Sequence, residues 1–183
     1  MTLYTLKIEL AYITPGVWRE LEVPGTYTLS HLHYVIQIAM GWEDYHLHLF
    51  TINGKGYSNN LSYEPKDLDE SKYAIEGVLG TTCKKFSYVY DFGDSWEHII
   101  IVEKISDPDK PKNYPVCLKG ELACPLEDCG GVPGYYALLE ALENPEAKEN
   151  QDLVEWAEDW DPENFDIDEI NKSLAKLGKR IKK

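Results

Sequence analysis

The stretch that decides the fold reads Phe86-Ser-Tyr-Val-Tyr-Asp-Phe92, then Gly93-Asp94, then Ser95-Trp-Glu-His-Ile-Ile-Ile-Val-Glu103. Two runs rich in aromatic and β-branched residues flank a Gly-Asp pair, which is typical of two antiparallel strands joined by a tight turn. If Phe92 pairs with Ser95, then Asp91 and His98 are diagonal neighbours on one face. The hairpin therefore predicts a β-sheet and places a carboxylate near an imidazole.

Alternating segments on the N-terminal side of this hairpin extend the sheet. Residues 3–12 and 17–23 alternate in polarity around a Thr-Pro-Gly turn signal, and residues 45–52 form another strand-like run. Between them, a helix is expected from Ser30 to Met40, with Thr28 or Ser30 as its N-cap and Gly41 as its end. The pattern predicts an α+β fold, with an antiparallel or mixed β-sheet and helices packed on one face.

The chain divides by composition into a domain and an extension. Residues 1–145 carry the strand and helix signals of the α+β domain, whereas residues 146–183 are acidic and helical in pattern. The last predicted helix, 167–181, places apolar residues on one stripe. We expect the extension to pack on the domain or on a partner chain.

Composition and charge limit the classes of function. The chain has 183 residues, with 18 basic and 32 acidic side chains and a formal net charge of −14, so its average surface repels nucleic acid. No apolar run is long enough to cross a bilayer, and the printed N-terminus lacks the pattern of a signal peptide. We expect a cytoplasmic protein that contacts no membrane and whose cysteines are reduced.

Three cysteines form the first candidate site. Cys117, Cys124 and Cys129 are spaced by six and four residues in a segment rich in Pro and Gly, which can wrap a tetrahedral ion. A fourth ligand is needed, and His98 on the neighbouring hairpin is the first choice, with His48 as the alternative. The sequence thus predicts a zinc site, and separate reduced thiols are the alternative interpretation.

Histidines and carboxylates form the second candidate site. On a strand, His46 and His48 point to the same face and could present two imidazoles to one ion. Asp91, Asp94 and Glu97 on the hairpin could complete a metal site or act as general bases. The alternative is structural, with Asp94 in a turn and Asp91 orienting His98 or binding loop amides.

Five blocks carry a family resemblance. They are Tyr-Thr-Leu-Ser-His-Leu-His (27–33), Met-Gly-Trp (40–42), His-Leu-His-Leu-Phe (46–50), Tyr-Asp-Phe-Gly-Asp-Ser-Trp-Glu-His (90–98) and Cys-Pro-Leu-Glu-Asp-Cys-Gly-Gly-Val-Pro-Gly-Tyr (124–135). In order and spacing they resemble the plasmid pRiA4b ORF-3-like family over residues 3–145. The resemblance implies a passenger protein of mobile elements, and it implies that His48, Asp91, Asp94, Trp96, His98, Cys124 and Cys129 belong to one site.

Three functions remain open on these residues. The first is a non-catalytic accessory protein that binds a protein partner or a second copy of itself and holds a structural zinc ion. The second is a metal-dependent hydrolase or nuclease in which His46, His48, Asp91 and His98 bind the ion and Asp94 or Glu97 acts as the base. The third is a nucleic-acid accessory factor of mobile elements, although the net charge opposes it.

Overall fold

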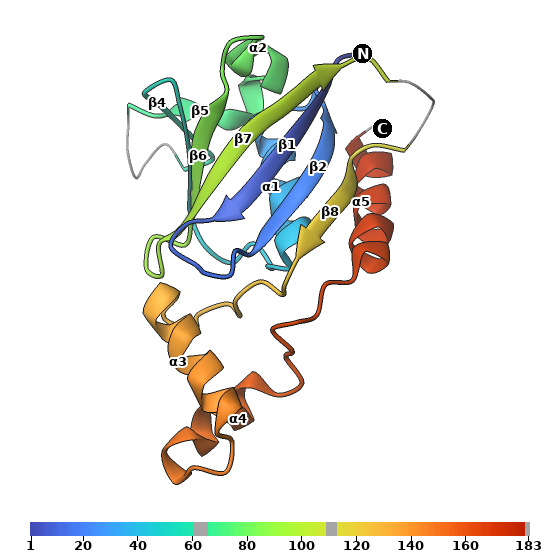
Figure 1. The fold of residues 1–183 in the computed structure, drawn as a ribbon. Coiled ribbons are helices and arrows are strands. Elements are labelled where there is room, and N and C mark those ends of the chain that lie inside the picture. The colour runs from blue at the N-terminus through green and yellow to red at the C-terminus, as the bar shows by residue number, and fades with distance from the viewer. Residues whose placement is uncertain (61–65, 109–112, 182–183) are drawn as a thin grey trace.

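The computed structural model describes residues 1–60, 66–108 and 113–181, and these form one curved sheet with helices on one side (Figure 1). Its strands are β1 (Leu3–Leu10), β2 (Trp18–Pro24), β3 (His48–Ile52), β4 (Lys55–Ser58), β5 (Leu68–Asp69), β6 (Lys85–Tyr90), β7 (Trp96–Ser106) and β8 (Val116–Glu121). The strand order is β5-β4-β3-β6-β7-β1-β2-β8. Every neighbouring pair is antiparallel except β4 and β5, so the sheet is mixed. The predicted α+β fold is confirmed.

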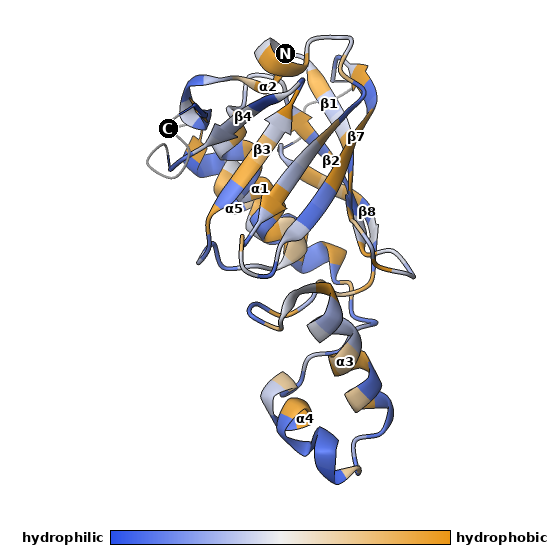
Figure 2. Cartoon of the chain, turned by 90° about the vertical axis from the view of Figure 1, so that its left-hand side faces the viewer, coloured by the Kyte–Doolittle hydropathy of each residue, from blue (hydrophilic) through white to orange (hydrophobic). Residues whose placement is uncertain are grey.

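The helices fall into two groups. The α-helices are α1 (Leu29–Met40), α2 (Ile75–Leu79), α3 (Gly131–Glu143), α4 (Gln151–Ala157) and α5 (Ile167–Ile181), with short 3-10 turns η1 (Glu70–Lys72) and η2 (Lys148–Asn150). Helices α1 and α5 pack against each other beside the sheet. Helices α3 and α4 form an end lobe that projects from one end of the sheet, with hydrophilic residues predominating at its far end (Figures 1 and 2). No helix within the described ranges is long and apolar enough to cross a membrane.

Helix α1 begins at Leu29, one residue before the predicted start, with Thr28 as its N-cap and Gly41 as its C-cap. The Thr28 side chain accepts a hydrogen bond from the His31 amide, and the His31 ring accepts one from the Thr28 amide, which satisfies two otherwise free donors. Gly41 ends the helix in the left-handed conformation, with φ of +95°. Its apolar stripe faces the sheet and is buried against alternate residues of β1: Leu6, Ile8 and Leu10.

The predicted register of the β6–β7 hairpin is wrong by one residue. Tyr90 pairs with Trp96, and His98 lies opposite Tyr88, because five residues rather than two form the turn. Asp91 and Ser95 both adopt positive φ angles, and the Ser95 amide donates to the Asp91 carbonyl at 2.6 Å. A one-residue shift turns each side chain to the other face of a strand, so Asp91 and His98 are not the diagonal neighbours that a tight turn would make them.

Helix α5 packs on the same body as the sheet. Leu174 is fully buried in the main hydrophobic core, and Leu177 is 8% exposed. The Asn171 side chain accepts a hydrogen bond from the Cys117 amide at 2.7 Å and donates one to the Cys117 carbonyl at 2.9 Å. Helix α5, the last part of the extension predicted from residue 146 onward, therefore covers strand β8. The sequence alone indicates only a loop where β8 lies.

We expect Leu174→Ala to lower the free energy of unfolding by roughly 2–5 kcal/mol, because it leaves a cavity in the core. Lys176→Ala on the exposed side of the same helix is the matched control and should change stability little. Urea denaturation of both variants measures this. Equal midpoints for the two would show that α5 contributes nothing to the core.

Candidate functional site

Three loops meet at one end of the sheet and form a loop cluster made of His46, Asp91, Glu127 and Asp128. His46 precedes β3, Asp91 follows β6, and the other two lie between β8 and α3. The His46 Nε2 atom lies 3.1 Å from Asp128 Oδ1 and 3.6 Å from Glu127 Oε2. Its Nδ1 atom lies 3.7 Å from Asp91 Oδ1. Both nitrogens of one imidazole thus face carboxylates.

Backbone and tyrosine hydrogen bonds hold these loops in place. The Asp91 amide donates to the Leu47 carbonyl at 2.9 Å, which joins the loop after β6 to the segment before β3. The Tyr90 hydroxyl and the Glu43 amide donate to Glu127 Oε1 at 3.0 and 2.8 Å. The Tyr90 hydroxyl also lies 3.3 Å from Oε2, which is the oxygen that faces His46. Burial and the hydrogen bond to Glu127 raise the pKa of Tyr90, so its hydroxyl stays a donor.

Three carboxylates surround the His46 ring. Its Nε2 atom is completely enclosed and has no hydrogen-bond partner, although two carboxylate oxygens lie close to it. The Asp91 side chain is only 9% exposed, whereas that of Asp128 is 69% exposed. Three carboxylates around one imidazole repel one another in a partly buried place unless a cation lies among them. The cluster is therefore enclosed on one side and open to solvent on the other.

Asp94 ties the hairpin loop to the start of α3. Its Oδ2 accepts a hydrogen bond from the Gly130 amide at 3.0 Å. The next residue, Gly131, has φ of +67°, and a Cβ atom there would lie 2.6 Å from the Asp94 carbonyl oxygen. Only glycine fits this approach, so the Gly-Gly pair at the start of α3 lets the loop reach the hairpin. Asp94 thus has a structural contact beside the cluster.

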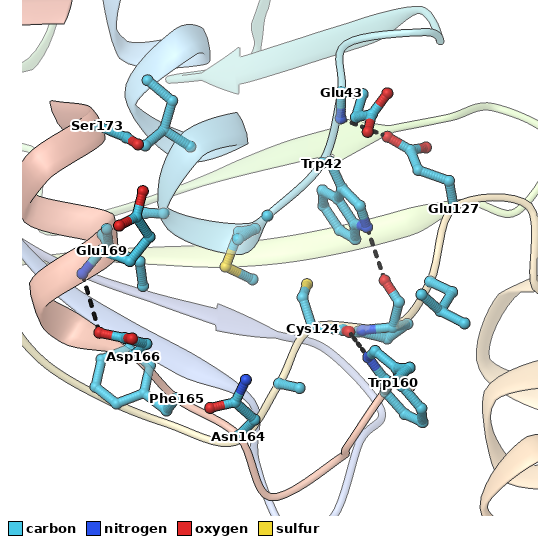
Figure 3. A pocket seen from close by; sticks show the side chains of 18 of the residues that line it. Trp42, Glu43, Cys124, Glu127, Trp160, Asn164, Phe165, Asp166, Glu169 and Ser173 are labelled. Carbon is cyan, nitrogen blue, oxygen red and sulfur yellow. Dashed lines mark hydrogen bonds between the residues drawn. The ribbon is translucent and has the colours of Figure 1, made fainter. Parts of the chain in front are cut away.

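A groove adjoins the loop cluster. It has a volume of about 740 Å³ and lies between the end of α1, residues 123–127 and residues 156–173. Glu127 belongs to both the groove and the loop cluster. Trp42 and Trp160 lie along the groove, and their indole N–H groups donate to the carbonyls of Pro125 and Cys124 (Figure 3).

His48 lies in a different, buried network. Its ring stacks on that of His33, with centroids 3.6 Å apart and planes at 9°, and its Nε2 lies 2.8 Å from Glu70 Oε2. The His33 nitrogens meet the Tyr88 hydroxyl and Asp44 Oδ1, each at 2.8 Å. Although His33, Asp44 and His48 offer ligand atoms within 4.8 Å, two parallel rings direct their lone pairs along parallel lines rather than at one ion. We interpret this network as structural.

The residues predicted to bind zinc do not meet. His98 is fully buried and its Nδ1 contacts the carbonyls of Trp96 and Tyr88, so this nitrogen is a donor. The groups whose ligand atoms gather within 4.8 Å, among the residues that the structure describes, contain no cysteine. Burial raises the pKa of Cys117 to about 11 and of Cys129 to about 12, and it also raises that of Cys124. Glu97 lies elsewhere, where it accepts a hydrogen bond from the Tyr12 hydroxyl.

The loop cluster therefore contains two predicted residues, His46 and Asp91, and two that the sequence analysis missed. Glu127 and Asp128 lie inside the Cys-Pro-Leu-Glu-Asp-Cys block, in which the two cysteines are the more obvious metal ligands. The available signal was that a His-containing block, an Asp-containing block and this Glu-Asp pair all belong to the family resemblance. Their convergence could not be read without the sheet order.

His98 makes stability sensitive to acid. Burial lowers its pKa to about 4, whereas an unfolded histidine has a pKa of about 6.5. Between these values the unfolded chain binds more protons, so this contribution is complete above pH 6.5 and is lost as the pH falls toward 4. We expect His98→Asn to reduce the slope of unfolding free energy against pH by up to one proton, about 1.4 kcal/mol per pH unit. Urea titrations between pH 7 and 4.5 measure it, and identical slopes would contradict it.

Comparison with known proteins agrees with the resemblance carried by the five blocks. The sequence model of the family described as plasmid pRiA4b ORF-3-like protein matches residues 2–169. "Uncharacterized protein y4hQ" of Sinorhizobium fredii (strain NBRC 101917 / NGR234) is 35% identical over 176 residues, which cover 94% of this chain and 90% of that protein. The crystal structure of a protein of unknown function, MM3350 from Methanosarcina mazei Go1, matches with a TM-score of 0.85 and 37% identity, covering 94% of this chain and 97% of that one. The chain belongs to the plasmid pRiA4b ORF-3-like family.

Proposed function

We propose that the loop cluster binds one divalent cation and that the protein is a metal-dependent hydrolase. The observation that carries the proposal is that His46, Asp91 and Asp128 offer three ligand atoms within 4.8 Å of one another, with Asp128 Oδ1 3.1 Å from His46 Nε2. Ligand atoms around a small divalent ion are about 3 Å apart when each metal–ligand distance is about 2.1 Å. The 3.1 Å between His46 Nε2 and Asp128 Oδ1 matches the separation of two ligands of such an ion.

The residues divide into ligands and a positioning group. His46, Asp91 and Asp128 would bind the ion, because each offers a ligand atom within 4.8 Å of the other two. Glu127 lies outside this group, with Oε2 3.6 Å from His46 Nε2, where a carboxylate can orient a metal-bound imidazole. One imidazole with two carboxylates suits zinc or manganese. This ligand set supports zinc binding at the loop cluster, whereas the sequence predicts zinc at the cysteines.

Three protein ligands and an exposed side support a catalytic rather than a structural ion. Structural zinc is closed by four protein ligands, whereas catalytic zinc keeps a position for water. Asp128 is 69% exposed, so water reaches the cluster from its side. A bound divalent ion lowers the pKa of a ligating water and so supplies a nucleophile for hydrolysis. The adjoining groove offers a place for substrate.

Isothermal titration of chelator-treated protein with zinc or manganese chloride tests the cation site. We expect about one ion per chain, loss of binding in His46→Ala, and about 10- to 100-fold weaker binding in Glu127→Gln, which removes only a positioning charge. Cys124→Ser is the matched control and should bind as the wild type does. Binding that survives His46→Ala but is lost in Cys124→Ser would move the ion to the cysteines and refute the loop cluster.

Hydrolysis of bis(p-nitrophenyl) phosphate and p-nitrophenyl acetate tests the catalytic part. We expect metal-stimulated turnover of at least one substrate, above the rate of the ion alone, and its loss in Asp128→Asn. One ion bound with no turnover of either substrate would contradict hydrolase activity. That result would favour the accessory protein with a structural ion, since the same cluster would then serve only to fix the three loops.

A further inference from the structure

The groove beside the loop cluster is an apolar channel with an acidic rim. Its floor includes Met40, Trp42, Leu126 and Phe165. Trp156 and Tyr45 also line it and are 45% and 70% exposed. Large aromatic side chains exposed beside a groove often mark a binding surface. At about 740 Å³ the groove lies within the range of about 300 to 1,000 Å³ that is typical of ligand sites.

The charge of the groove is strongly one-sided. Five carboxylates line it: Glu43, Glu127, Glu158, Asp166 and Glu169. Glu169 also forms an exposed ion pair with Lys172, at 3.0 Å, outside the lining. Arg19 is the single cation in the lining, and it is 2% exposed. Its guanidinium donates to the carbonyls of Trp18, Ala39, Glu121 and Leu122 and lies 4.6 Å from the Phe165 ring centroid. Four of its five N–H donors are therefore used within the protein, and its burial keeps the charge away from a ligand in the groove.

The carboxylates form two banks. Glu43 and Glu127 lie on one side of the groove, Asp166 and Glu169 lie on the other side, and Trp42 and Cys124 lie between them (Figure 3). Two separated acidic banks with an apolar floor match a ligand with two separated cations and an apolar middle. Lysine and arginine carry their charge on long apolar stems, which can lie along such a floor. Their cations can also contact the exposed faces of Trp156 and Tyr45.

We infer that the groove binds a basic segment of a partner protein, with a lysine or arginine near each acidic bank and an aliphatic residue between them. This occupant satisfies the apolar floor and both banks at once, whereas a polyphosphate chain would meet five carboxylates and no exposed cation in the lining. The inference does not rest on the cation or on hydrolysis. Of the five carboxylates only Glu127 is shared with the loop cluster, and it faces His46 through Oε2.

Fluorescence anisotropy with a fluorescein-labelled peptide of alternating lysine and leucine tests this inference. Titration of the full chain should give saturable binding that weakens as salt is raised, because the rim charges are exposed. The peptide with glutamate in place of lysine should not bind. Equal binding of the two peptides, or binding that is unchanged by salt, would overturn the inference.

Variants at the two banks test whether both are used. Glu43→Gln and Glu169→Gln should each weaken binding about threefold, and the double variant about tenfold. Glu103→Gln on strand β7 removes the same charge from an exposed position outside the groove and is the matched control. Trp156→Ala should also weaken binding. If Glu103→Gln weakens peptide binding as much as the bank variants do, the peptide responds only to the net charge of the protein, and the inference is wrong.

Two further measurements separate this inference from its rivals. Repeating the titration with excess chelator should leave the affinity unchanged, so that failure of the cation site and failure of peptide binding are distinguishable. Light scattering should show the same mass for wild type and for the double bank variant. An assembly that the added lysine–leucine peptide dissociates would mean that a second copy of the chain occupies the groove, which would overturn the assignment to a partner protein.

Discussion

The buried guanidinium of Arg19 is the constraint on which the site end of the molecule depends. It projects from β2 and is 2% exposed, and burial lowers its pKa from the ordinary value for arginine. Removing such a charge from water is costly unless every donor is satisfied. Here the donors reach carbonyls at the end of α1, at the end of β8 and in the loop after it. Each charged hydrogen bond contributes about 1.5–3 kcal/mol, so the three segments are held together strongly.

The loop after β8 is held by donors to its carbonyls rather than by thiolates. Arg19 binds the carbonyls of Glu121 and Leu122, Trp42 binds that of Pro125, and Trp160 binds that of Cys124. These bonds shape the loop so that Glu127 and Asp128 reach His46. The same bonds position the walls of the groove. One set of contacts therefore serves both the cation proposal and the peptide proposal, although each can fail without the other.

Local sequence signals predict most elements, and the errors have local physical causes. The capping residues of α1 and the alternation of β1 are visible in the sequence because they depend on neighbours a few residues apart. The turn after β6 is longer than predicted because Asp91 and Ser95 adopt left-handed conformations, which favour glycine and are not signalled by these residue types. Residues 75–79 form a helix although an apolar run that short also fits a strand.

The site was only half predictable for a related reason. His46 and Asp91 are recognisable as ligand types, and their proximity follows from β3 pairing with β6. The loop between β8 and α3 reaches them from the far edge of the sheet, because β8 is the last strand in the order. No periodicity reports such a long-range approach. The predicted zinc site at the cysteines rests on their spacing in the sequence. Spacing does not show whether the three thiols converge on one position in the folded protein.

The side-chain amide of Asn171 has a consequence for how the protein behaves at high concentration. A terminal strand of a sheet presents free backbone groups that can pair with another chain and seed aggregation. On β8 the amide and carbonyl of Cys117 are both occupied by Asn171. At the opposite end of the sheet, β5 is only two residues long. Both borders of the sheet are therefore poor templates for a foreign strand, which lets the eight-stranded sheet remain self-contained.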